Sequence, residues 1–313
     1  MPGTDPAEAM RVIAGELPGF PHLPELPGRG PGADIAGRTA ALLIDMPVEI
    51  TPRGWRLAEH PGRDMARATS MLSTDLDVME EELQGYVGPL KIQVCGPWTL
   101  AATLELTRTM DAALSDQGAV ADLAASLKEA VVKHVADVAK RVPGAHLVVQ
   151  IDEPALTAIA NGEVSTASGL SRIPAIDEST IIERLGHVLA NTTGYTVVHC
   201  CATSVRFEII KAAGSNAVAF DLSQLRRGEE DTVAELAEAG MGLFMGADTG
   251  TTSRQTAERA VSLWRRMGMR ARAEQTVITP ACGLAGDSPA QARDALKRCR
   301  EAAAILPEMG EQL

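Results

Sequence analysis

Residues 195–201 are Tyr-Thr-Val-Val-His-Cys-Cys, a run of strand-forming residues that ends in an imidazole and two thiols. Aromatic and β-branched residues of this kind favour an extended strand. In an extended segment His199 and Cys201 project from the same face, whereas Cys200 projects from the opposite face. Two ligands do not hold zinc tightly, so a metal site here needs at least one further Cys, His or carboxylate from elsewhere in the chain.

The sequence around this stretch alternates predicted strands with predicted helices. Short apolar runs typical of strands are separated by longer segments of helical periodicity. This order predicts an α/β fold with a parallel sheet, and polar residues at the strand ends favour a (β/α)8 TIM-type barrel, whose active site lies at the carboxyl ends of its strands. The predicted barrel strands are residues 20–26, 91–95, 146–151, 195–200, 217–220, 242–245 and 276–280.

These segments supply seven strands, and the start of the chain leaves little room for an eighth. Asp5-Pro6-Ala7-Glu8 has the capping-box pattern that begins a helix. We therefore predict that the first barrel strand is truncated or lies at the extreme N-terminus. Residues 48–57 alternate around a Thr-Pro-Arg-Gly turn and predict a hairpin. No linker rich in Pro, Gly and Ser divides the chain, so residues 1–313 are predicted to form a single barrel domain.

Composition narrows the class of protein. The 313 residues are 45% hydrophobic and 22% charged, as in a globular protein, and the net charge of −12 argues against a nucleic-acid partner. The sequence has no signal-peptide pattern and no run approaching 18 apolar residues, so we expect a cytoplasmic location and no membrane partner. The 5 cysteines are an odd number in a large chain, which favours reduced thiols or metal ligands over disulfides.

Residues able to bind a metal or a substrate follow several of the predicted strands. If all strand ends face one rim of a barrel, these side chains meet although they are far apart in sequence. One His, two Cys and a carboxylate satisfy tetrahedral zinc. The residues placed at this rim are Glu25, Asp152, Glu153, His199, Cys201, Asp221 and Cys282.

The other cysteines and histidines are assigned no chemistry. Most buried cysteines behave as small hydrophobic residues, so Cys95 and Cys299 are expected in the core. The remaining histidines, His22 and His134 among them, lie on helices, strand starts or loops without partners, and we expect no role in the site for them.

Four motifs together resemble those of one family. They are Gly-Pro-Trp-Thr at 96–99, Val-Gln-Ile-Asp-Glu-Pro-Ala-Leu at 149–156, His-Cys-Cys at 199–201 and Pro-Ala-Cys-Gly-Leu at 280–284. In type and order they are similar to motifs of the C-terminal catalytic domain of cobalamin-independent methionine synthase and its short single-domain relatives. The resemblance covers about residues 1–304. It implies a zinc-dependent methyltransferase of methionine biosynthesis, with a catalytic zinc held by His199, Cys201 and Cys282.

The resemblance also implies roles for the acidic residues of the rim. Asp152 matches the aspartate that contacts the substrate amino group in the family, and Glu25 matches the acidic residue after its second strand. Glu153 follows Asp152 and is taken as a further substrate-binding residue. Asp221 stands where the family has a zinc-binding glutamate, and its side chain is one methylene shorter.

Two departures from the family concern the methyl donor. Residues 245–248 are Met-Gly-Ala-Asp where the family has Asp-Ile-His, so Ala247 stands in place of a histidine. Asp248 then becomes a candidate catalytic acid, and Asp152 is the other candidate catalytic residue. The family's N-terminal barrel, which helps bind folate, has no counterpart in this sequence. The expected donor is therefore either methyl-folate or a methyl-corrinoid protein.

The chemistry of this site agrees with methyl transfer to a thiol. A zinc ion bound by two thiolates can take a substrate thiol as a ligand and lower its pKa, which gives a nucleophile at neutral pH. Carboxylates of Asp152 and Glu25 suit a substrate ammonium group, so an amino thiol such as homocysteine fits the charge pattern. The expected reaction is the methylation of homocysteine to methionine.

Two alternatives remain open. A metal-free barrel lyase similar to uroporphyrinogen decarboxylase would use arginines to bind propionate groups, whereas the rim motifs of this chain carry acids. A non-catalytic barrel that binds zinc or a thiol would keep the ligands without turnover, and the departures at Asp221 and Ala247 keep this alternative open. Substitution of Cys201 with serine separates the cases, because an enzyme would lose rate and a binding protein would lose only metal.

Overall fold

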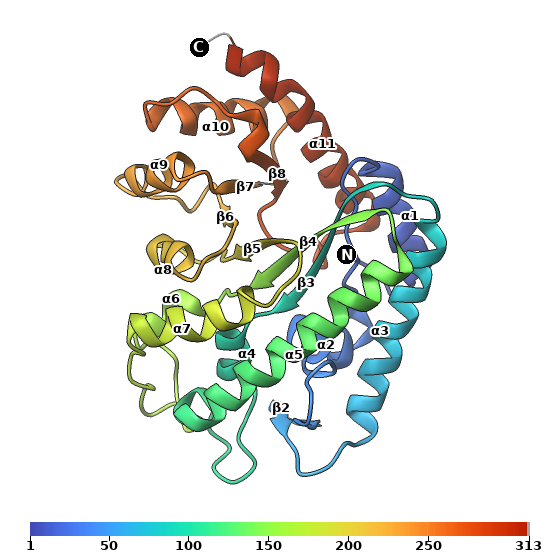
Figure 1. Cartoon of the computed structure of the whole chain (residues 1–313), viewed down its shortest axis with the longest axis vertical. Helices are drawn as coiled ribbons and strands as arrows, with labels where there is room; N and C mark the ends of the chain where they lie inside the picture. Colours follow the sequence, from blue (N-terminus) through green and yellow to red (C-terminus); the bar gives the residue numbers. More distant parts are fainter. Residues whose placement is uncertain (249, 312–313) are drawn as a thin grey trace.

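The computed structural model describes residues 1–248 and 250–311, and its centre is a curved parallel sheet of six strands (Figure 1). Neighbouring strands in the sheet are consecutive in the chain, so each is reached by a helical crossover. The α/β fold expected from the alternation of strands and helices is confirmed. The strands are β3 (Gly88–Cys95), β4 (Ala145–Asp152), β5 (Tyr195–His199), β6 (Ala217–Asp221), β7 (Gly242–Ala247) and β8 (Thr276–Pro280).

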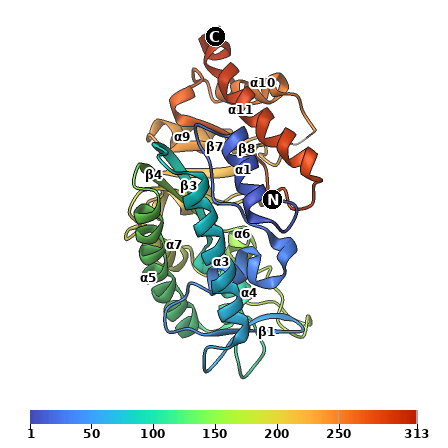
Figure 2. The same cartoon turned by 90° about the vertical axis from the view of Figure 1, so that its right-hand side faces the viewer.

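Helices cover the outer face of the sheet and form a closed ring around it. α1 lies between α3 and α11 and contacts both, as Figure 2 shows, so the ring closes beside the free edge of the sheet. No helix of the described residues is both long enough and apolar enough to cross a membrane. The helices are α1 (Pro6–Glu16), α2 (Ile35–Ala40), α3 (Arg63–Glu82), α4 (Pro97–Thr103), α5 (Gln117–Arg141), α6 (Leu156–Ala160), α7 (Glu178–Leu189), α8 (Phe207–Ala212), α9 (Glu230–Glu238), α10 (Ser253–Arg266) and α11 (Pro289–Glu311).

Outside the barrel sheet, the predicted hairpin at residues 48–57 is confirmed. β1 (Val48–Thr51) pairs with β2 (Gly54–Leu57) in antiparallel register. The hairpin contacts α3, where Asp64 accepts a hydrogen bond from the Ile50 N–H (3.0 Å). The hairpin therefore packs against the helix layer.

The two faces of the sheet belong to two separate apolar clusters. On β5, Val198 packs in the main core between sheet and helices, together with Cys200 just beyond the strand, whereas Val197 packs in a smaller cluster inside the curve of the sheet. Alternation along a strand produces this division. His199 is two residues after Val197, so it points to the same face of β5, and it lines the interior cavity. The prediction that His199 and Cys200 point to opposite faces is confirmed.

Residues 20–26 follow the expected path beside β3 but are not a regular strand. They make a single parallel bridge, His22 with Lys91. The Leu23 N–H donates to the Lys91 carbonyl (2.9 Å), and the Lys91 N–H donates to the Pro21 carbonyl (3.0 Å). Prolines at 21, 24 and 27 lack the N–H groups that a longer ladder needs, so the prediction of a full strand was wrong.

The described residues add no strand to the barrel sheet beyond β3 to β8, and the sheet therefore stays open beside β8. β8 ends the strand order and pairs with β7 alone. Its other edge faces residues 20–26 across the interior cavity, which both segments line. The curved sheet is therefore an open barrel of six strands and one bridged segment.

A buried ion cluster fixes the segment that carries Glu25. Asp75 on α3 is 1% exposed, and its Oδ2 accepts hydrogen bonds from Arg29 (2.7 Å) and Arg38 (2.8 Å). Arg38 also donates to the Pro24 carbonyl (2.9 Å), next to Glu25. Since two guanidinium groups depend on one carboxylate, its removal would leave buried charges without a partner.

Replacement of Asp75 by asparagine should therefore lower the free energy of unfolding by about 3–5 kcal/mol. Urea denaturation followed by circular dichroism measures this loss. The matched control is Asp77→Asn on the same helix, where an exposed pair with Arg141 should contribute less than about 1 kcal/mol. Equal losses for the two variants would contradict a special role for the buried cluster.

His134 on α5 should make stability depend on acid pH. It is 5% exposed, and burial, followed by the nearby charge of Arg38, lowers its pKa to about 4. The folded state holds a neutral ring, so the unfolded state binds more protons below the ordinary pKa of about 6.5. Stability should fall by up to about 3 kcal/mol as the pH drops from 6.5 towards 4. His134→Gln should flatten this part of the profile in urea titrations, while the exposed His187→Gln should leave it unchanged.

Candidate functional site

The parallel register of β4 and β5 builds the centre of the site. It pairs Asp152 with His199 at the carboxyl ends of the two strands. Asp152 Oδ1 lies 2.9 Å from His199 Nδ1 and also accepts a hydrogen bond from the Gln150 amide (2.7 Å). Asp152 is only 5% exposed, so this contact fixes the imidazole ring and leaves its Nε2 for another partner.

Two thiols meet beside this imidazole. Cys201 follows β5 and Cys282 follows β8, and the Cys201 thiol interacts with both Cys282 and His199. These two interactions lower the pKa of Cys201 to about 4. Burial alone would lower the pKa of His199, but hydrogen bonds with Asp152 and then Cys201 raise it to about 10. The protein alone therefore favours a thiolate beside an imidazolium.

Cys282 and Asp221 are the other two residues that the sequence analysis names as metal ligands. The hydrogen bond with Cys201, then burial, then the negative charges of Cys201 and Asp221 raise the pKa of Cys282. Asp221 ends β6, and its Oδ1 accepts hydrogen bonds from the backbone and hydroxyl of Ser223 (2.8 and 2.7 Å). Its Oδ2 is free of hydrogen bonds from the described residues, so one carboxylate oxygen is available.

The donor set at this rim fits zinc in its chemistry. Imidazole nitrogen, thiolate sulfur and carboxylate oxygen are the ligands of catalytic zinc sites. Cys201 interacts with a donor on each side, and the charge of Asp221 acts on Cys282. In the described part of the chain, no three His, Cys, Asp or Glu side chains together have the geometry of a metal site. The ligands are therefore brought together as neighbouring pairs.

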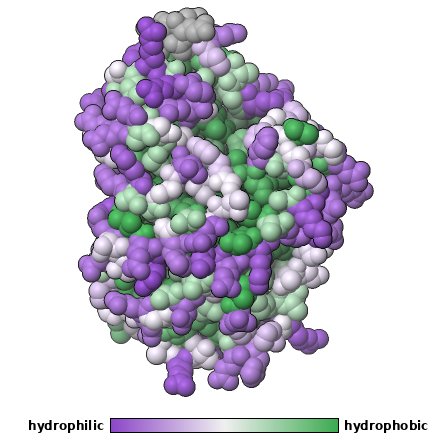
Figure 3. Space-filling view, in the orientation of Figure 1, coloured by the Kyte–Doolittle hydropathy of each residue, from purple (hydrophilic) through white to green (hydrophobic). Residues whose placement is uncertain are grey.

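A cavity of about 680 Å³ opens beside these residues, between residues 20–26 and β8. Glu25, Asp152, His199 and Cys282 line it, so most of the predicted rim residues share one space. Burial raises the pKa of Glu25. Figure 3 shows apolar surface gathered near the middle of the face that Figure 1 presents. The cavity thus combines apolar walls with a few ionisable groups, as small-molecule sites do.

Sequence reasoning missed several polar residues of this cavity. Lys91 and Gln93 of β3, Gln150 of β4, and His22 all line it. A signal was present, because Lys91 and Gln93 alternate with Ile92 and Val94 in a strand of a parallel sheet, where both faces are ordinarily apolar. His22, which was expected to have no role, lies in the cavity through its bridge to β3.

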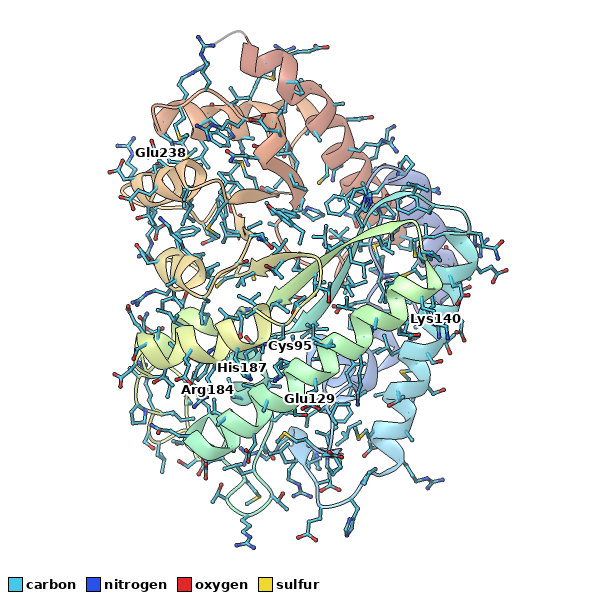
Figure 4. The ribbon with its side chains drawn as sticks, in the orientation of Figure 1. Cys95, Glu129, Lys140, Arg184, His187 and Glu238 are labelled. Atoms are coloured by element: carbon cyan, nitrogen blue, oxygen red, sulfur yellow. The ribbon has the colours of Figure 1, made fainter. Side chains whose placement is uncertain are left out.

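The remaining cysteines and the outer helix faces agree with the sequence analysis. Cys95 and Cys299 are buried in the main core. Figure 4 shows Cys95 inside the molecule, whereas Glu129 on α5 and Glu238 on α9 lie at its outside. Cys299 also lines the cavity.

Glu153 does not line the cavity, contrary to its expected role in substrate binding. It is 0% exposed, and its carboxylate accepts hydrogen bonds from the backbone N–H of Trp98 (2.9 Å) and from the backbone and hydroxyl of Thr99 (both 2.7 Å). Glu153 therefore caps the N-terminus of α4. A Cβ at Gly96 would overlap this carboxylate, which explains the glycine.

Asp248 also lies apart from the cavity that holds Asp152. It is exposed, and its Oδ1 accepts a hydrogen bond from the Gly250 N–H (2.9 Å). It lines a second cavity of about 870 Å³ at the end of β7, together with Ala247. The structure thus gives the candidate catalytic acid no contact with the imidazole and thiol group.

Replacement of Glu153 by glutamine should test its capping role. Burial raises the pKa of Glu153 to about 7, although the hydrogen bonds from Thr99 and Trp98 oppose this shift. At pH 8 the carboxylate is ionised, and the amide of Glu153→Gln would turn an N–H group towards these donors. The free energy of unfolding should fall by about 1–3 kcal/mol in urea denaturation. The exposed Glu163→Gln is the control and should change it by less than about 0.5 kcal/mol; an equal effect would disprove the cap.

The curved parallel sheet, with an imidazole and two thiols at the carboxyl ends of its strands, defines a TIM-barrel-type protein with a thiol-rich site. Comparison with protein families specifies it further. The family model described as the catalytic domain of cobalamin-independent synthase matches residues 89–305, and this chain belongs to that family. The matched range contains β4 to β8 and all but the first residue of β3, together with His199, Cys201 and Cys282.

One solved structure supports the fold. A B12-independent methionine synthase from Shewanella sp. W3-18-1, in complex with selenomethionine, has a TM-score of 0.55 at 13% identity over 83% of this chain and 72% of that chain. The carboxyl transferase domain of pyruvate carboxylase from Rhizobium etli has a TM-score of 0.37 at 11% identity over 87% and 47% of the two chains, too low to bear on the fold. Among curated proteins, none matches this chain.

Proposed function

We propose that this protein is a zinc-dependent thiol methyltransferase that transfers a methyl group to homocysteine and forms methionine. The interaction of Cys201 with both His199 and Cys282 carries this proposal, because it joins donors from two separate strand ends at one cavity. Membership of the cobalamin-independent synthase family supports it. So does the fold shared with a methionine synthase solved in complex with selenomethionine.

His199, Cys201 and Cys282 would hold the zinc ion, with Asp221 as the fourth protein donor. Bound zinc supplies a Lewis acid that lowers the pKa of a substrate thiol. Asp152 orients the imidazole of His199 through Nδ1, so that Nε2 is the nitrogen that binds. Oδ2 of Asp221 is free of hydrogen bonds within the described residues, which favours its use as a ligand despite the shorter side chain.

The acids of the cavity would bind the amino group of the substrate. Glu25 and Asp152 line the same space, and a substrate ammonium would neutralise two carboxylates held close together. Asp152 is then a positioning group for His199 and a substrate contact at once. Glu153 has no part in this binding, because its carboxylate caps α4.

The methyl donor is proposed from the proton balance of the reaction. Transfer from a folate nitrogen breaks an N–C bond and requires a proton on the leaving amine. Ala247 supplies no acid, and Asp248 lies in a different cavity. Transfer from a methyl-corrinoid breaks a Co–C bond, and the electron pair stays on cobalt without a proton. The arrangement of acids therefore favours a methyl-corrinoid protein over methyl-folate as the methyl donor. The cytoplasmic location expected from the sequence stays a separate prediction.

Zinc content and methyl transfer should depend on Cys201 but not on its neighbour. Purified protein should contain about one zinc per chain by elemental analysis, and a chelator should abolish methylation of homocysteine until zinc returns. Cys201→Ser should lose most of the zinc and reduce the rate at least about 100-fold, because a thiolate ligand is removed. Cys200→Ala is the matched control, since this thiol packs in the main core.

The same assay separates the alternatives. Methylation of homocysteine is followed with methyl-cobalamin and with methyl-folate as donors. Zinc without turnover on either donor would favour a non-catalytic zinc-binding barrel. Well-folded protein without zinc, unchanged by Cys201→Ser, would refute the proposed metal site.

A further inference from the structure

Lys91 places an ammonium group inside the cavity with few partners. It lies on β3, lines the cavity, and its Nζ contacts Gln93 Oε1 at 3.4 Å. Among the described residues it makes no ion pair, although the charges of Asp152 and Glu25 act on it from a distance. Lys91 is only partly buried, but its ammonium has one weak hydrogen bond and no ion pair within the described residues, so an anionic group that enters the cavity would give it the charged partner that it lacks.

Gln93 holds this ammonium in position. Its side chain is buried, and its Nε2 donates to the Leu23 carbonyl (2.8 Å), which turns Oε1 towards Lys91. Residues 20–26 and β3 therefore fix the direction of Lys91 together. An ammonium fixed by a buried amide is a built binding group rather than a mobile surface lysine.

The strand register gives the depth of each charged group. Cys95 of β3 pairs with Asp152, and Lys91 lies four residues earlier on the same strand, about 13 Å deeper along the backbone. Its long side chain lines the same cavity as Glu25 and Asp152. Asp152 and His199 lie at one level of the sheet, where the register pairs them, and the Lys91 backbone lies deeper than both. The cavity therefore offers an ammonium below a carboxylate and an imidazole, a set of charges that can receive the carboxylate and the ammonium of an amino-acid thiol.

We propose that Lys91 binds the α-carboxylate of the substrate and makes the cavity selective for amino-acid thiols over amines that carry only a thiol. The identity of the thiol rests on the proposed function, whereas the selectivity for a carboxylate is a property of binding alone. Lys91 would bind the carboxylate of the zwitterion, and the pair Glu25 and Asp152 would bind its ammonium, which is attached to the same carbon. This assigns specificity to a residue outside the thiol and imidazole group.

Isothermal titration calorimetry under reducing conditions tests the proposal. The ligands are homocysteine and 3-aminopropane-1-thiol, which is homocysteine without its carboxylate. Wild-type protein should prefer homocysteine by about 10–100-fold, as expected for a charged hydrogen bond. Lys91→Met should abolish this preference by weakening homocysteine alone. Lys140→Met, at an exposed lysine of α5 that Figure 4 labels, is the control and should keep the preference.

A second variant guards against misfolding. Lys91→Arg keeps the charge and should retain a preference for homocysteine of at least several-fold, with thermal unfolding recorded for each variant. Equal affinity of wild-type protein for both ligands, or an equal loss of both in folded Lys91→Met, would overturn the proposal. Failure of the proposed function has a different signature: wild-type protein would methylate neither thiol while its preference for the carboxylate persisted.

Discussion

The contact between Asp152 and His199 depends on the parallel register of β4 and β5, and the rest of the site depends on this contact. Gly194, just before β5, makes the close approach of the strands possible, because a Cβ there would lie 2.6 Å from the Leu147 carbonyl. A slip of one residue would turn His199 into the outer core and bring Cys200 inside. The same register sets Cys201 on the inner face, where a thiol after the distant strand β8 can reach it.

The open sheet and the closed ring of helices together explain the cavity. The described strands leave a free edge at β8, while α1 joins α11 to α3 and keeps the helix layer continuous. Small side chains such as Ala217 and Ala219 line the inside of the curve, so the interior is not filled. The ion cluster of Asp75 holds the bridged segment across the gap. The chain thus keeps a ligand-sized space where a complete small barrel would be packed with side chains.

The sequence predicts the positions of residues that follow strand ends for two reasons. Side chains alternate along each strand, and a TIM-type barrel has its site at the carboxyl ends of its strands, so both inferences need only the local sequence. Asp152, His199 and Cys201 were predicted on this basis, and the structure brings them together. Glu153 was misassigned because alternation was applied to residues 199–201 but not to the adjacent acids, of which only one can face inwards. Lys91 was missed because its strand was judged by its apolar residues. The depth of a side chain in the cavity depends on tertiary contacts, and the prolines limit how far residues 20–26 pair with β3. Sequence periodicity reports neither of these.

Because side chains alternate between the two faces of a strand, the adjacent acids Asp152 and Glu153 have different roles. Glu153 faces the helices, where its carboxylate satisfies three donors at the start of α4 and holds the turn after β3. Asp152 faces the cavity, where its carboxylate contacts the His199 imidazole. Because the two residues share one backbone segment, the cap that stabilises the fold also fixes the end of β4. The position of the contact between Asp152 and His199 therefore depends on hydrogen bonds made on the opposite face of the sheet. A substitution at Glu153 would affect the cavity only by shifting the end of β4.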